Sequence, residues 1–223
     1  MLLAIDTATR VASLALYSEG AVLSEHTWVS QNNHTVELVP NIARLLEGQR
    51  ATPQALTGLA VALGPGSFTG LRIGLSVAKG FALGLGIPLV GIPTLDVLAY
   101  AHAPWGLPIW AILQAGRGRI CAAFYPREGP PPRPADYLLT TLAELEVEGD
   151  EALLFCGEID PQGAELLRQR VGDRAVIAPP AASLRRAGYL AELAWERLRR
   201  GEEDDLATLS PIYLHRPRIG EGP

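Results

Sequence analysis

The sequence contains little lysine and few charged residues in general, and both features restrict the classes of function that the protein can have. Charged residues make up 19% of the 223 residues, and Lys79 is the single lysine among 19 basic residues. The formal net charge is −5, so the chain lacks the basic excess of proteins that bind nucleic acid directly. We therefore expect any contact with RNA to run through a partner protein.

Cysteine clusters and long apolar runs are also missing. Cys121 and Cys156 stand 35 residues apart with no CxxC motif, and the four histidines are scattered. We expect both thiols to be buried, reduced and inert, and we expect no structural zinc site. No apolar run reaches the roughly 20 residues of a membrane span, and the first ten residues, MLLAIDTATR, do not resemble a signal peptide. The predicted location is the cytoplasm, without membrane contact.

The apolar residues, 48% of the chain, fall into short runs that predict an α/β fold. Three strands open the chain and are followed by alternating helices and strands. The predicted strands of the first half are 2–5, 11–17, 21–28, 58–63 and 87–92, and its helices are 34–50, the second part of 62–86, and 94–101.

The second half repeats this order, which gives βββαβαβα twice. Its predicted strands are 109–113, 120–125, 137–139, 152–157 and 175–178, and its helices are 140–148, 161–171 and 183–200. The pattern predicts two lobes, each a mixed sheet with helices on its faces. We place the first lobe at 1–103 and a shortened second lobe at 104–223, whose C-terminal tail could return to the first.

A glycine-rich segment, GPGSFTG at 64–70, joins a predicted strand to a predicted helix. Backbone amides at such a helix start can bind an anion. However, Leu71 and Arg72 follow the last glycine where a P-loop has Lys and Ser or Thr. The pattern favours a turn in which Ser67 or Thr69 caps the helix, with anion binding as the alternative.

Two helices carry surfaces that indicate close packing. The helix after the glycine-rich segment is poor in side-chain bulk, which is tolerated where another backbone approaches, from its own lobe or from a partner. The helix at 34–50 has apolar positions spread over roughly 180°, more than the roughly 100° that a core-facing stripe needs. We therefore predict a subunit interface that contains Leu38, Ile42, Leu45, Gly70, Arg72, Gly74 and Ala78.

Few residues are candidates for chemistry. Asp6, Thr7 and Thr9 follow the first strand, where an acid could hold a metal–phosphate or simply belong to a hairpin turn. His34 and Glu37 are spaced i, i+3 but have no third ligand, so a solvated helix start is the favoured interpretation. No Ser/His/Asp order can be argued from the spacing. The chain is poorly equipped as a catalyst.

Four segments together carry a resemblance to a known family. They are LLAIDTATRVASLAL, NHTVELVPNI, ALGPGSFTGLRIGLSVAKGFALGLGIPLVGI and PIYLHR. The sequence resembles, over essentially its whole length, the TsaB (YeaZ) family, a bacterial subunit of the machinery that makes N6-threonylcarbamoyladenosine (t6A) at position 37 of tRNA. The resemblance implies two RNase H-like lobes of the ASKHA fold, which sugar kinases, actin and heat-shock chaperones share.

The resemblance also implies that ligand positions have been lost. The His-x-x-x-His metal pair of TsaD, the related transferase, falls on Thr94 and Leu98, so no metal site is expected. In the turn LQAGRGRI, Ala115 and Gly116 depart even from the TsaB pattern and Arg117 remains. A vestigial ligand site would comprise Asp6, Thr7, Thr9, Ser67 and Arg117. His215 stands where an arginine is more usual.

What the resemblance implies for function is a non-catalytic subunit without a cofactor. Such a subunit is required for t6A modification of adenosine 37 in tRNAs that read ANN codons. It binds and activates a TsaD-like transferase, helps to recruit a TsaE-like ATPase, and pairs with itself when alone. The alternative is an enzyme in its own right, either a glycoprotease-like peptidase or a kinase-type ATPase.

Overall fold

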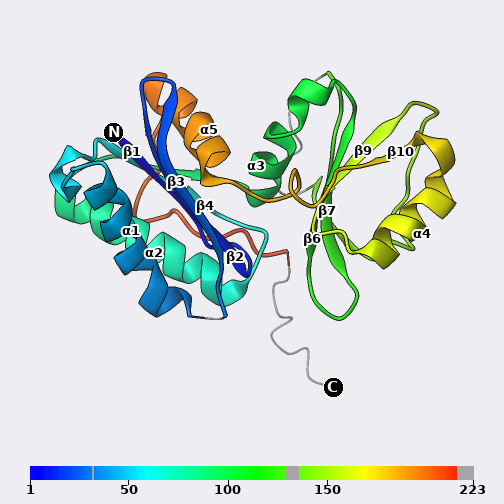
Figure 1. The fold of residues 1–223 in the computed structure, drawn as a ribbon, viewed down its shortest axis with the longest axis horizontal. Coiled ribbons are helices and arrows are strands. Elements are labelled where there is room, and N and C mark those ends of the chain that lie inside the picture. Colours follow the sequence, from blue (N-terminus) through cyan, green and yellow to red (C-terminus); the bar gives the residue numbers. More distant parts are fainter. Residues whose placement is uncertain (32, 129–135, 215–223) are drawn as a thin grey trace.

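The computed structural model describes residues 1–31, 33–128 and 136–214. In this part of the chain, two five-stranded sheets lie side by side with helices packed on them (Figure 1). We call the sheet formed by residues 2–92, with its helices, the first lobe, and the sheet formed by residues 109–177, with its helix, the second lobe.

The first sheet has the order β3-β2-β1-β4-β5. Its strands are β1 (Leu2–Asp6), β2 (Val11–Ser18), β3 (Ala21–Val29), β4 (Gly58–Ala62) and β5 (Leu89–Ile92). β1 pairs antiparallel with β2 and parallel with β4, so that Ile5 lies between Leu14 and Val61. The carboxyl ends of β1, β4 and β5 therefore meet at one edge, where the loops that follow them come together.

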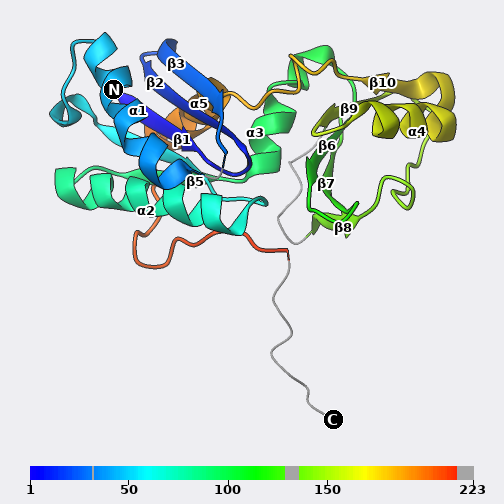
Figure 2. The same ribbon diagram turned by 60° about the horizontal axis from the view of Figure 1, so that its bottom comes forward.

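Helices cover both faces of the first sheet. α1 (His34–Gly48) and α2 (Phe68–Leu85) lie side by side on one face, and α5 (Ala187–Arg199) lies on the other (Figures 1 and 2). Side chains alternate along β1: Leu3 and Ile5 join the core under α1 and α2, and Leu2 and Ala4 join the core under α5. Alanines dominate this second core, so α5 can pack closely on the sheet.

The second sheet has the order β10-β9-β6-β7-β8. Its strands are β6 (Ile109–Gln114), β7 (Ile120–Tyr125), β8 (Leu138–Thr140), β9 (Leu153–Gly157) and β10 (Ala175–Ile177). α4 (Pro161–Val171) packs on β10, and its Leu167 and Val171 join the core on one face of this sheet. α3 (Thr94–Tyr100), which follows the last strand of the first sheet, packs on the other face.

The predicted helix at 140–148 is wrong, because this segment forms only a turn. It begins as a helix would, with Thr141 Oγ1 accepting from the Glu144 amide at 3.2 Å. The Arg170 guanidinium then donates to the carbonyls of Leu142, at 2.5 Å, and Leu145, at 3.0 Å. These carbonyls are held by a side chain of α4 instead of by amides one turn later. The described second half therefore runs βββ-βαβα, while the first half follows the full predicted order.

The segment after residue 104 is not confined to the second lobe. α5 contacts β1, β2, β4 and β5, and the chain beyond it continues along the first lobe. There Asp204 Oδ2 accepts from the Gly91 amide at 2.7 Å, and the Ile212 amide donates to the Leu63 carbonyl at 2.8 Å. A division between residues 103 and 104 separates the two sheets but leaves α5 and this tail on the far side of the boundary.

α2 is long and apolar enough, by length and composition, to cross a membrane, and among the described residues it is the single helix that passes this test. The helix has 18 residues and includes Arg72 and Lys79, so it is not an uninterrupted apolar run. Core helices pass the same test, and α2 packs against β4 and β1 of its own lobe.

Candidate functional site

The glycine-rich segment is a helix-capping turn. Ser67 Oγ accepts from the Gly70 amide at 3.3 Å at the start of α2, which confirms the capping interpretation. Gly64 adopts φ +109° and is held from both sides by Thr94: its amide donates to Thr94 Oγ1 at 3.0 Å, and its carbonyl accepts from the Thr94 amide at 2.8 Å. The turn thus joins the loops after β4 and β5.

The small residues in the first half of α2 allow this helix to pack closely inside its own lobe. Thr7 Oγ1 donates to the Gly70 carbonyl at 2.8 Å, and a Cβ on Gly70 or on Gly74 would overlap atoms of Thr7. Ala78 is fully buried further along the same face. The prediction that Gly70, Gly74 and Ala78 form a subunit interface is therefore wrong, because this face meets the loop after β1.

Leu38, Ile42 and Leu45 of α1 are likewise buried in the core of the first lobe, so their assignment to a subunit interface is also wrong. Val36 and Val39 of the same helix are the exposed apolar residues. Arg72, the remaining predicted interface residue, is exposed; its guanidinium lies 3.7 Å from the centre of the Phe68 ring, and its Nε donates to Tyr213 Oη at 2.9 Å.

Both α1 and α2 expose apolar side chains or bare backbone on their outer sides. Val36 is 68% exposed, Val39 48% and Leu83 71%. A Cβ on Gly80 or Gly84 would meet no atom within 4 Å. We call these five residues the outer helix face. Val36 and Val39 lie in the first turns of α1, and Gly80, Leu83 and Gly84 lie in the last turns of α2. The two helices run parallel, because each follows one of the parallel strands β3 and β4, so the two groups lie toward opposite ends of the helix pair.

The loop after β1 contains a buried ionic cluster. The Arg185 side chain is 3% exposed and that of Asp6 1%, and Arg185 Nε lies 3.1 Å from Asp6 Oδ2. The same guanidinium donates to Thr9 Oγ1 at 2.5 Å and to the Val11 carbonyl at 3.2 Å, and lies 3.4 Å from Glu158 Oε1. An internal cation thus occupies the space beside the carboxylate that sequence analysis considered for a metal–phosphate.

The structure brings together part of the predicted vestigial site. Asp6 and Thr9 meet at Arg185, while Thr7 and Ser67 are engaged with α2. Arg117 is exposed in the β6–β7 turn at φ +56° and forms no hydrogen bond or ion pair with Asp6, Thr9 or Ser67. Arg185 and Glu158 were not predicted from the sequence, because each lies far along the chain from Asp6 and belongs to no motif. His215 lies outside the described residues.

The side chains at the positions considered for metal binding are buried inside the protein. Thr94 is buried against the glycine-rich turn and Leu98 is buried in the second-lobe core. His34 is buried, contrary to the predicted solvated helix start, and its Nε2 lies 3.2 Å from the Thr9 carbonyl oxygen. Within the ranges that the structure describes, no three His, Cys, Asp or Glu side chains form a group that could hold a metal ion.

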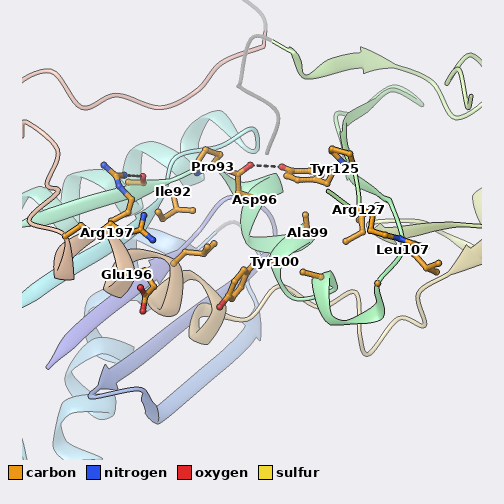
Figure 3. A pocket seen from close by; sticks show the side chains of 17 residues that line it. Ile92, Pro93, Asp96, Ala99, Tyr100, Leu107, Tyr125, Arg127, Glu196 and Arg197 are labelled. Carbon is orange, nitrogen blue, oxygen red and sulfur yellow. Dashed lines mark hydrogen bonds between the residues drawn. The ribbon is translucent and has the colours of Figure 1, made fainter. Parts of the chain in front are cut away.

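A cavity of about 670 Å³ opens between α3, α5 and the end of β7 (Figure 3). Its walls are largely apolar, and Asp96 of α3 contributes a carboxylate. Asp96 Oδ1 accepts from Tyr125 Oη at 2.6 Å and from Tyr137 Oη at 2.8 Å. Burial raises the pKa of Asp96, and the two phenol hydrogen bonds offset this rise in part.

Comparison with known proteins agrees with this architecture. A family model described as TsaD, tRNA N6-adenosine threonylcarbamoyltransferase, matches residues 22–130. The "tRNA threonylcarbamoyladenosine biosynthesis protein TsaB" of Bacillus subtilis is 31% identical over 219 residues, which are 96% of this chain and 93% of the relative. The Escherichia coli protein of the same name is 35% identical over 131 residues, 57% of this chain and 55% of its own.

A solved structure gives the same result for the fold. YeaZ from Pseudomonas aeruginosa is 28% identical, with a TM-score of 0.79 over 96% of this chain and 99% of its own. The two sheets described above are the RNase H-like lobes of the ASKHA fold. The likeness extends through both lobes, and the chain therefore belongs to the TsaB (YeaZ) family of tRNA threonylcarbamoyladenosine biosynthesis proteins.

Proposed function

We propose that this protein is a non-catalytic subunit required for t6A modification of adenosine 37 in tRNAs that read ANN codons. In this role it binds and activates a TsaD-like transferase in the cytoplasm and helps to recruit a TsaE-like ATPase. It pairs with itself when the transferase is missing, needs no cofactor, and meets tRNA only through the complex.

The observation that carries this proposal is the outer helix face. Val36 and Val39 expose apolar side chains on α1, and Leu83 exposes one on α2 next to two glycines that present only backbone. Apolar residues next to backbone that can be approached closely are what a helix of another protein can pack against. The proposed interface therefore keeps the two helices that sequence analysis selected but uses their opposite sides.

The ionic cluster supports the non-catalytic part of the proposal. A kinase-type ATPase needs its carboxylates free to bind the metal ion that holds the phosphates, but Asp6 is already paired with the Arg185 guanidinium. A metal-dependent peptidase needs a ligand set, and Thr94 and Leu98 stand at the two histidine positions that the family resemblance identifies. Both features disfavour the alternative of an independent enzyme.

The test is reconstitution of transfer to unmodified tRNA from labelled threonylcarbamoyl-adenylate, with each of the three proteins omitted in turn. We expect no transfer by this protein alone and strongly reduced transfer when it is left out, because a partner subunit can select the active arrangement of a two-lobed enzyme. Undiminished transfer in its absence contradicts the activator role. Transfer by this protein alone contradicts the non-catalytic role and makes Asp6, Thr9 and Arg117 the first residues to mutate.

A matched pair of variants tests the surface itself. Leu83→Asp places a charge on the outer helix face, and Leu184→Asp places one at an exposed leucine, 38% accessible, that lies outside this face. We expect Leu83→Asp to abolish association with the transferase in sedimentation experiments and to leave the thermal melt unchanged. Equal association by the two variants contradicts the assignment of this face.

A further inference from the structure

The cavity beside α3 has features of a small-molecule site that the proposed function does not use. Its volume of about 670 Å³ is within the roughly 300–1,000 Å³ of ordinary ligand pockets. Ile92, Pro93, Ala99, Leu107 and Leu193 supply apolar wall. Figure 3 shows the side chains of α3 between those of α5 on one side and those around Leu107 and Arg127 on the other.

Asp96 is the polar group that points to a ligand. Both phenols hydrogen-bond to Oδ1, and Oδ2 receives no hydrogen bond from the described residues. Asp96 lines the cavity and is only partly buried, so Oδ2 is the carboxylate oxygen that remains for a ligand there. Tyr125 and Tyr137 thus fix the carboxylate through Oδ1, and no residue that the structure describes donates to its second oxygen.

The other charged groups of the wall are already paired. Arg197 lies 3.1 Å from Asp204 Oδ1 and also donates to the Gly91 carbonyl, and Arg127 lies 3.8 Å from Glu151. Arg200 and Glu196 have their own partners, Glu202 at 3.9 Å and Arg199 at 3.8 Å. Among the lining residues that the structure describes, Asp96 is therefore the charged side chain without an oppositely charged neighbour.

We propose that this cavity binds a small organic ammonium ion that carries an apolar body. The ammonium group donates to Asp96 Oδ2, and the body covers the apolar wall between α3 and α5. A carboxylate that is partly removed from water gains most from a charged donor, since charge-assisted hydrogen bonds are about twice as strong as neutral ones. Burial raises the pKa of Asp96 because it destabilises the charged carboxylate, and a bound cation offsets this destabilisation.

The test compares three probes of similar shape on the unaltered protein: 2-phenylethylammonium, neutral 2-phenylethanol and the 3-phenylpropanoate anion. Binding is followed by titration calorimetry and by the amide NMR signals of Ala99 and Ala103 in the wall. We expect the ammonium to bind saturably and at least about tenfold more tightly than the alcohol. Equal affinity of these two probes, preference for the anion, or no saturable binding of the ammonium overturns the proposal.

Variants then locate the contact. Asp96→Asn keeps an acceptor for the two phenols and removes the charge, so the affinity for the ammonium should fall at least about tenfold. Glu196→Gln removes a charge from the exposed rim of the same cavity and should change it by less than about twofold. An Asp96→Asn protein that binds as tightly as the parent overturns the assignment. If this variant does not fold, the comparison of ammonium with alcohol on the unaltered protein decides.

Discussion

Arg185 and Asp6, which are 179 positions apart in the sequence, form a buried ion pair of 3.1 Å between the segment before α5 and the end of β1. Glu158, which follows the second-lobe strand β9, accepts from the same guanidinium at 3.4 Å. One side chain therefore ties the two lobes together. An arginine of the chain thus lies beside the first-strand carboxylate where the two lobes meet.

Replacing Arg185 by alanine should be strongly destabilising. It leaves Asp6 buried without its counter-charge, and breaking a buried ion pair in this way typically costs about 3–5 kcal/mol. Arg185→Lys should recover only part of the loss, because one ammonium group cannot reach the acceptors that the planar guanidinium serves. Chemical denaturation monitored by circular dichroism measures the free energy of unfolding.

The matched control for this prediction is Arg186→Ala. Arg186 is the next residue, its side chain is 50% exposed, and it pairs with Glu25 at the surface. Its loss should cost less than about 1 kcal/mol. Similar losses for the two variants contradict a special role for the buried pair.

Low millimolar methylguanidinium should raise the melting temperature of Arg185→Ala and leave that of Arg186→Ala unchanged.

One substitution at two glycines of α2 should have opposite effects. Gly74→Ala forces a Cβ into Thr7 and should lower the melting temperature. Gly80→Ala adds a Cβ where there is open space and should raise stability by up to about 1 kcal/mol, because alanine is the better helix former. Differential scanning calorimetry of the two variants and the parent decides. A stabilised Gly74→Ala protein contradicts the packing of α2 on the loop after β1.

His102 should make the protein less stable in mild acid. Burial lowers the pKa of this imidazole below 6.5, and the nearby Ala182 backbone offsets this in part. The unfolded chain takes up a proton near pH 6.5 while the folded chain still resists it. Stability is therefore complete above pH 6.5 and falls as the pH drops from there through the pKa of the folded state.

This effect of His102 is measured as the slope of the free energy of unfolding against pH between pH 7.5 and 5. His102→Phe keeps a ring next to Trp105, whose ring centre lies 5.8 Å from that of His102, and removes the titration. The variant should show a shallower slope than the parent. His26→Phe, at an exposed position on β3, serves as the control for loss of one histidine. Identical slopes for the parent and His102→Phe exclude this effect.

Both cysteines should resist alkylation in the native state. Cys121 and Cys156 are buried and free, and burial raises the pKa of Cys121 to about 11. At pH 8 the reactive thiolate is then scarce and shielded. Mass spectrometry after iodoacetamide treatment should find no adduct in the native protein and two in denaturant. Rapid native modification of Cys121 contradicts its buried position.

The sequence by itself determined the features that depend on neighbouring residues. The strand and helix order of the first half follows from the spacing of apolar residues, and the Ser67 cap follows from a hydroxyl residue at the start of a helical pattern. The family could be recognised for the same reason, since its longest marker is one continuous segment. Such signals need no knowledge of what lies across the core.

Tertiary structure alone decided the features that depend on contacts between distant segments. Helical spacing identifies the stripes of α1 and the bare face of α2 but not which side meets the sheet, so Leu38 and Gly74 were assigned outward although both face the core. The segment 140–148 has a helical pattern, but Arg170 of α4 holds its carbonyls in a turn. Arg185 becomes the counter-ion of Asp6 only because α5 returns to the first sheet, a path set by packing and not by any local pattern.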